Sequence, residues 1–102
     1  MTDPVEMLIG EDAFMEPLVV GAFSWKLDED PTRRSLCVVL PRVGYIEIPV
    51  VDGSPCRHEW LWDGDVERPT IRPSVKSETR NAKGDVSWHG FITDGRLEEC
   101  GS

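Results

Sequence analysis

Two cysteines and two histidines have the most specific chemistry in this sequence. Cys56 and His58 are two positions apart, and His89 and Cys100 follow near the end of the chain. Side chains two apart on a strand share a face, so this set suits a tetrahedral, structural zinc site. The spacing matches no standard zinc finger, and buried free cysteines are common. We therefore expect no cofactor, with zinc at these four residues as the alternative.

Three carboxylates at alternate positions form a second candidate. Asp63, Asp65 and Glu67 could hold a hard divalent cation such as magnesium. The pair Asp63-Gly64 is better explained by turn chemistry, and the spacing is not that of a calcium loop. The sequence favours a turn here over a metal site.

Support for nucleophilic catalysis is confined to Ser87 and His89, two positions apart on one predicted strand. No Gly-x-Ser-x-Gly elbow and no glycine-rich nucleotide-binding motif accompanies them. We therefore expect a non-catalytic protein. A small metal-dependent hydrolase that uses His58, Asp63, Asp65 and His89 is the weakest alternative.

Aromatic and basic residues lie between these candidates. Trp60 and Trp62 alternate onto one face, and the sequence favours core anchors over an aromatic ligand platform. The proline-punctuated stretch 68–74 is interpreted as a structured connection. The alternative is contact with an anion or a partner through Arg68 and Arg72.

The elements that position these residues are predicted to be strands. Segments 18–25, 36–40 and 45–51 are rich in β-branched or aromatic residues. Segment 36–40 is apolar at every position, as in a central strand that is buried on both faces. Pro49 cannot donate to a ladder, so segment 45–51 is expected to run along an edge.

Turn signals separate the predicted strands. The Asp-Gly pairs at 52–53, 63–64 and 94–95 favour turns that need a positive φ. The third pair predicts a closing hairpin between 86–92 and 96–99.

The expected fold is all-β. About seven short, mostly antiparallel strands predict a small sandwich or barrel, formed as a single domain by residues 1–102. Residues 1–17 are expected to form an irregular or short helical lead-in, and residues 18–100 the β core.

Composition excludes several classes of protein. The 102 residues include 19 acidic and 11 basic ones, and the net charge of −8 argues against a nucleic-acid binder. No apolar run reaches the roughly 20 residues that span a bilayer. Residues 1–4 lack the features of a signal peptide, and the three cysteines are an odd number, so we expect reduced thiols and a cytosolic location.

The excess charge lies in the first third of the chain. Residues 1–30 contain eight acidic residues and one basic residue, for a local net charge of −7. A solvated face is the simplest interpretation, and an acidic patch that docks on a basic partner is the alternative. The candidate contact residues are Glu6, Glu11, Asp12, Glu16, Asp28, Glu29 and Asp30.

Two motifs carry a family resemblance. The block 60–74 contains Trp-Leu-Trp-Asp-Gly-Asp followed by Pro-Thr-Ile-Arg-Pro-Ser, and the block 89–97 begins His-Gly-Phe-Ile-Thr-Asp-Gly. The chain thereby resembles short uncharacterised proteins encoded by bacteriophages and prophages. The resemblance covers residues 60–100 and implies a phage gene expressed in the cytoplasm of a host bacterium.

These observations lead to a first functional hypothesis. We expect a non-catalytic phage accessory protein that inhibits a host protein, such as a defence protein or nuclease, whose basic surface the acidic residues contact. The alternative is a virion structural or assembly component that self-associates through the edge strand 45–51. The partner and the oligomeric state stay open, and no contact with nucleic acid or membrane is expected.

Overall fold

The computed structural model describes residues 4–10, 19–53, 59–82 and 84–100. In these residues the protein is all-β, with nine strands and no helix. The strands are β1 (Val5–Glu6), β2 (Leu8–Ile9), β3 (Ala22–Leu27), β4 (Arg33–Leu40), β5 (Gly44–Val51), β6 (Trp60–Trp62), β7 (Ile71–Asn81), β8 (Gly84–Thr93) and β9 (Arg96–Glu99).

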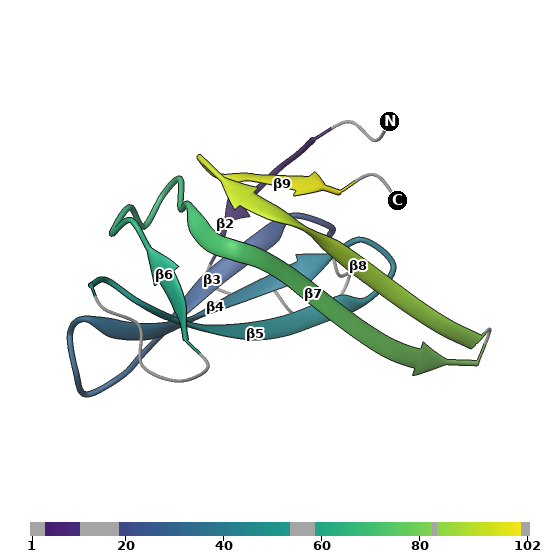
Figure 1. Ribbon diagram of the computed structural model, residues 1–102, viewed down its shortest axis with the longest axis horizontal. Helices are drawn as coiled ribbons and strands as arrows, with labels where there is room; N and C mark the ends of the chain where they lie inside the picture. Colours follow the sequence, from purple (N-terminus) through teal and green to yellow (C-terminus); the bar gives the residue numbers. More distant parts are fainter. Residues whose placement is uncertain (1–3, 11–18, 54–58, 83, 101–102) are drawn as a thin grey trace.

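The strands form a single sheet that curls into a nearly closed barrel (Figure 1). The strand order is β1-β9-β8-β7-β6-β5-β4-β3-β2, so β1 and β2 lie at the two ends of the sheet. These two strands are separated only by Met7, whose backbone N–H donates to Gly95 O at 2.9 Å. The N–H of Leu8 donates to Gly21 O at 2.9 Å. One short segment therefore links both ends of the sheet.

The core fills the inside of the curled sheet. Leu36, Val38 and Leu40 alternate along β4 and are almost fully buried, as expected for side chains on one face of a strand. Trp88 on β8 is the largest fully buried side chain, and Phe23 on β3 belongs to the same cluster. None of the described residues forms a helix long and apolar enough to cross a membrane.

Two strand predictions are confirmed in detail. Segment 36–40 is buried at every position and lies in β4, between β3 and β5. In β5, Ile48 and Val50 are buried whereas Glu47 and Pro49 are exposed. Among the described residues, only the last two positions of β5 pair with β6. Pro49 therefore lies on a largely open edge, as its missing N–H predicts.

The predicted turns also form. Gly53, Gly64 and Gly95 all have positive φ angles, and so does Asp94, with φ 49°. Two consecutive residues with positive φ give the tight hairpin that joins β8 to β9. The expected closing hairpin is therefore confirmed.

The first residues differ from the prediction. Strands β3, β4, β5, β8 and β9 correspond to the predicted segments, although β3 begins at Ala22 and not at residue 18. Strands β1 and β2 lie where an irregular or helical lead-in was expected. A two-residue strand is too short to show alternation, so the sequence contains no signal for it. Residues 11–17 of that lead-in lie outside the described residues.

Candidate functional site

A serine and a histidine meet on the outer face of the barrel. Ser74 Oγ lies 2.9 Å from His89 Nε2, within hydrogen-bond distance. Ser74 belongs to β7 and is half-buried, whereas His89 belongs to β8 and is exposed. A serine hydroxyl hydrogen-bonded to an imidazole is the arrangement that activates a serine nucleophile. The pair is accessible to a large substrate because it lies at the surface.

Ser74 lies in an irregularity of the β7–β8 ladder. Ile71 pairs with Ile92, and the next pair is Val75 with Gly90, so three residues of β7 face a single residue of β8. A bulge of this kind bends a strand and redirects its side chains. Ser74 is the last residue of the bulge.

Trp60 fixes the backbone of the same bulge. Its indole Nε1–H donates to Ser74 O at 3.2 Å, and its ring packs against the hydrophobic core. The sequence favoured a core role for Trp60 and Trp62, which agrees with the structure: Trp62 is 4% exposed. Trp60 also positions the candidate nucleophile, a role that the sequence did not suggest.

A groove of about 440 Å³ lies beside His89, on the side away from β7. It is lined in part by Arg42, Ser87, His89, Glu99 and Cys100. Arg42 donates to Ser87 O at 3.0 Å and forms an ion pair with Glu99. The imidazole of His89 therefore stands between Ser74 and an open groove that can receive part of a bound molecule.

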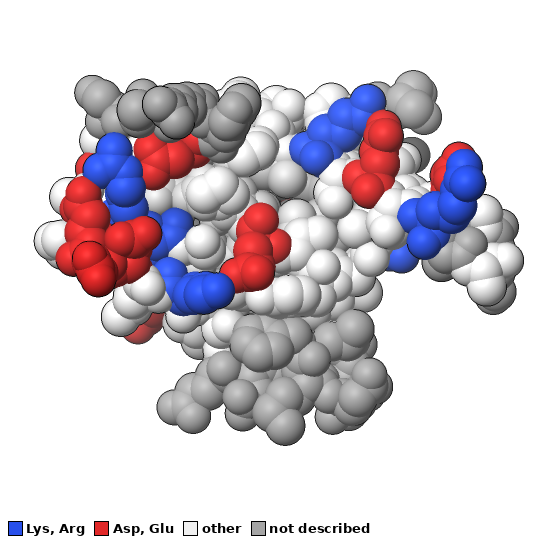
Figure 2. Space-filling view, turned by 90° about the horizontal axis from the view of Figure 1, so that it is seen from below, with Lys and Arg blue, Asp and Glu red and all other residues white. Residues whose placement is uncertain are grey.

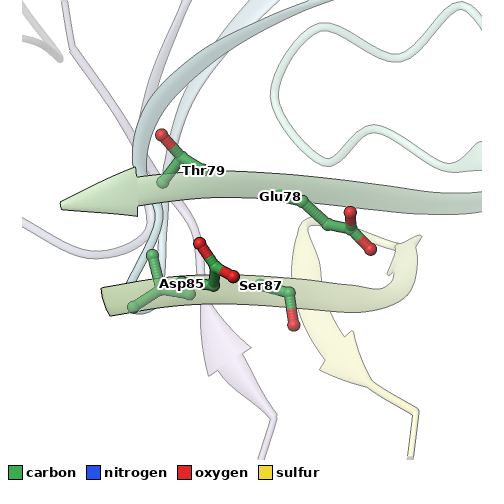
Figure 3. Close-up of a pocket in the computed structure, with 5 residues that line it drawn as sticks. Glu78, Thr79, Asp85 and Ser87 are labelled. Carbon is green, nitrogen blue, oxygen red and sulfur yellow. The ribbon is translucent and has the colours of Figure 1, made fainter. Parts of the chain in front are cut away.

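The serine that the sequence singled out has a different setting. Ser87 is two residues from His89 on β8, but the hydroxyl that hydrogen-bonds to His89 belongs to Ser74. Ser87 also lines a hollow of about 450 Å³ on the β7–β8 hairpin, together with Glu78 and Asp85 (Figure 3). Both carboxylates are engaged in ion pairs, and no histidine or cysteine lines this hollow in the described part of the chain. Nothing described there would activate Ser87.

The predicted zinc ligands are only partly described. Cys56 and His58 lie outside the described residues, whereas His89 and Cys100 line the same groove. The backbone N–H of Cys100 donates to His89 O at 2.8 Å. Within the ranges that the structure describes, no three His, Cys, Asp or Glu side chains could hold a metal ion. Zinc at the four-residue set stays a prediction.

The alternate carboxylates serve the loop that precedes β7. Asp63 Oδ1 accepts the backbone N–H groups of Asp65 and Thr70, and Asp65 Oδ1 accepts those of Glu67 and Arg68. The turn interpretation agrees with these contacts. The metal-dependent hydrolase built on Asp63 and Asp65 gains no support from the described residues.

The basic stretch 68–74 is structured, but only residues 68–70 form a connection, because β7 begins at Ile71. Arg68 Nε donates to Asp94 Oδ1 at 3.0 Å. Arg72 donates to Ile92 O and to Thr93 Oγ1 at 3.1 and 2.9 Å. Both guanidinium groups therefore hydrogen-bond this stretch to the β8–β9 hairpin.

The acidic residues of the first third are partly described. Glu11, Asp12 and Glu16 lie outside the described residues. Asp28 and Glu29 are exposed in the loop between β3 and β4. The carboxylates of Glu6 and Asp30 form ion pairs.

Intramolecular contacts neutralise part of this acidity. Glu6 accepts from Arg96 Nε at 2.8 Å, and Asp30 accepts from Arg33 Nη1 at 2.8 Å. Hydrogen bonds from Thr32, followed by that from Arg33, hold the pKa of Asp30 below its usual value. On the face drawn in Figure 2, acidic and basic side chains lie next to one another. Docking of a basic partner on the acidic residues stays a prediction.

The part of the sequence that carries the site matches a known family. A family model described as BubE, a bacterial ubiquitination-like system serine protease, matches residues 43–100, more than half of the chain. No curated protein and no solved structure matches. The matched region runs from the start of β5 past β9 and contains both Ser74 and His89.

Proposed function

This chain belongs to the BubE family, and on that premise we propose that it is a serine hydrolase that cleaves peptide bonds. Ser74 is the nucleophile and His89 is the general base. The observation that carries the proposal is the 2.9 Å contact between Ser74 Oγ and His89 Nε2. The description of the family as a serine protease supports it, because such an enzyme needs an activated serine.

The reaction follows from the two side chains. Ser74 Oγ attacks the carbonyl carbon of the scissile peptide bond while His89 Nε2 accepts the hydroxyl proton. The C–N bond then breaks, and the imidazolium of His89 returns that proton to the departing amine, which leaves an ester on Ser74. Water attacks the ester carbonyl, and His89 takes a proton from the water. The imidazolium gives this proton back to Ser74 Oγ as the carboxylic acid leaves.

The tautomer of His89 is part of the proposal. To accept the serine proton, Nε2 must carry a free lone pair, so Nδ1 carries the hydrogen of the neutral ring. No carboxylate of the described ranges hydrogen-bonds to His89. The proposed machinery is therefore a Ser–His pair that functions without an orienting carboxylate from those ranges.

Active-site labelling tests the proposal directly. A fluorophosphonate probe reacts only with an activated serine, and mass spectrometry of the digested protein identifies the labelled residue. We expect the label on Ser74 and expect S74A to lose it together with hydrolysis of p-nitrophenyl acetate. S87A is the matched control, since Ser87 is an exposed serine on the strand that carries His89, and it should keep both activities. Absence of label, or label on Ser87, would overturn the assignment.

The first hypothesis from the sequence is not needed for this activity. A phage accessory protein that inhibits a host protein through its acidic residues would contact its partner from the first third of the chain. Two of the described acidic residues in that region, Glu6 and Asp30, already form ion pairs with arginines of the same molecule. We therefore prefer the hydrolase, and inhibition of a host protein stays a separate prediction.

A further inference from the structure

Among the residues that the structure describes, one edge of β7 has no pairing partner next to the Ser–His pair. β6 pairs with β7 only at Ile71 and Arg72, whereas β8 accompanies β7 from Val75 to Asn81. Among the described strands, none pairs with β7 on the β6 side beyond Arg72. The open edge begins where the bulge that carries Ser74 ends.

The direction of the backbone groups on this edge follows from one hydrogen bond. His89 O accepts the N–H of Cys100, so the backbone groups of His89 point away from β7. Successive residues of an antiparallel strand direct their N–H and C=O groups to opposite sides. The backbone groups of Trp88 and Gly90, the neighbours of His89, therefore point toward β7.

The same alternation applies to β7. Gly90 is paired with Val75 and Trp88 with Ser77, so these two β7 residues direct their backbone groups toward β8. The intervening residue Lys76 directs its N–H and C=O away from β8. Glu78 follows the same alternation, so the open edge presents donors and acceptors at every second residue.

We propose that the open edge of β7 binds the substrate as an added strand, from Lys76 toward the end of the hairpin. The inference rests on the proposed function, since it uses Ser74 as the nucleophile. An extended peptide matches alternating N–H and C=O groups with its own backbone. At the Ser74 end of this edge, the indole Nε1–H of Trp60 donates to Ser74 O, so the added strand ends next to the Ser–His pair.

The charges along the edge indicate what kind of peptide is bound. Lys76 forms an ion pair with Glu78 at 3.2 Å, and Arg80 forms one with Asp85 at 2.8 Å. The exposed side chains thus neutralise one another and present no single sign of charge. Recognition then depends on the backbone of the ligand more than on its side chains. The substrate class is an extended, unfolded segment of a protein, such as a tail or a linker.

Binding of peptides to S74A, which cannot cut them, tests the inference. From a library of random fluorescein-labelled decapeptides, the tightest binder is selected and resynthesised with one N-methyl group at each position in turn. Each N-methyl group removes one backbone donor. We expect affinity to fall about tenfold at every second position and to change less than twofold at the positions between. No binding from the library, or a loss without alternation, would overturn the inference.

Two variants of β7 complete the test. E78P removes the N–H that points to the open edge and leaves the ladder to β8 intact, and proline is tolerated at such positions. We expect E78P to bind the selected peptide about tenfold more weakly than E78A does and to lose peptide cleavage in proportion. E78A keeps the N–H and is the control for loss of the Glu78 side chain.

The outcomes separate the two proposals. If E78P binds the selected peptide as tightly as E78A does, strand addition at β7 is wrong, even where Ser74 carries the fluorophosphonate label. If Ser74 is not labelled but the N-methyl pattern alternates, the binding edge stands and the hydrolase is wrong. The alternating pattern is measured on S74A, in which β7 is unaltered from Lys76 onward, so a folding defect in E78P leaves the inference testable.

Discussion

Replacing the proposed general base separates catalysis from folding. In H89Q, the amide of glutamine can still hydrogen-bond to the hydroxyl of Ser74, but it cannot accept a proton at neutral pH. His89 is exposed, and its contact with Ser74 lies at the surface. Substitutions at exposed positions usually change the free energy of unfolding by less than about 0.5 kcal/mol. The variant should therefore fold as the parent protein does.

The catalytic loss should be far larger than the loss of stability. A positioned general base contributes roughly 10²- to 10⁴-fold to a rate. At about 1.4 kcal/mol per factor of ten, this range corresponds to about 2.8–5.6 kcal/mol of transition-state stabilisation. Since no described carboxylate hydrogen-bonds to His89, we expect the loss of rate in H89Q to lie near the lower end of this range.

The assay compares peptide cleavage with stability in the same samples. Cleavage of fluorescein-labelled, carboxymethylated casein gives kcat/KM, and urea denaturation gives the free energy of unfolding. C100S is the matched control, because Cys100 lines the groove beside His89 but takes no part in the proposed reaction. The kcat/KM of C100S should stay within about twofold of that of the parent protein, both with and without EDTA. A folded H89Q that cleaves casein at the parental rate would refute the general-base assignment.

Two further predictions concern β8 and the turn that joins it to β9. A Cβ atom at Gly90 would lie 2.4 Å from Glu98 O and 2.7 Å from the ring of Trp88, so G90A should lower the free energy of unfolding in urea by about 1–3 kcal/mol. The hydrogen bond from Arg68 holds the pKa of Asp94 below its ordinary value of 3.8. The contact between Asp94 and Arg68 therefore stabilises the folded protein above pH 3.8, and this stabilisation is lost as the pH falls through the lowered pKa. The difference in melting temperature between the parent protein and D94N should therefore become smaller in acid.

The strands were predictable wherever a local pattern specified them. Continuous apolar character marked segment 36–40 as a central strand, Pro49 marked an edge, and the Asp94-Gly95 pair marked the last hairpin. Each signal depends on residues that are neighbours in the sequence. The strands β1 and β2 had no such signal, because their pairing partners lie on β9 and β3 and each is only two residues long.

The site could not be predicted for a related reason. His89 was a candidate in several schemes, but its partner Ser74 is fifteen positions away on another strand. Regular pairing from Ile71 and Ile92 would set Ser74 opposite His89, but the sequence indicates neither that pair nor the bulge that changes the register after it. The one available signal was the motif Pro-Thr-Ile-Arg-Pro-Ser, which ends at Ser74 and whose prolines are poorly suited to a regular ladder.

Both proposals about the site involve the bulge. On one side of β7, the bulge ends at Ser74, which contacts His89. On the other side, it coincides with the end of the pairing with β6 and thus with the beginning of the open edge. An unpaired edge next to the nucleophile can bind the backbone of a peptide substrate. A small substrate does not contact this edge. Cleavage of extended peptides should therefore depend on β7 far more than hydrolysis of p-nitrophenyl acetate does.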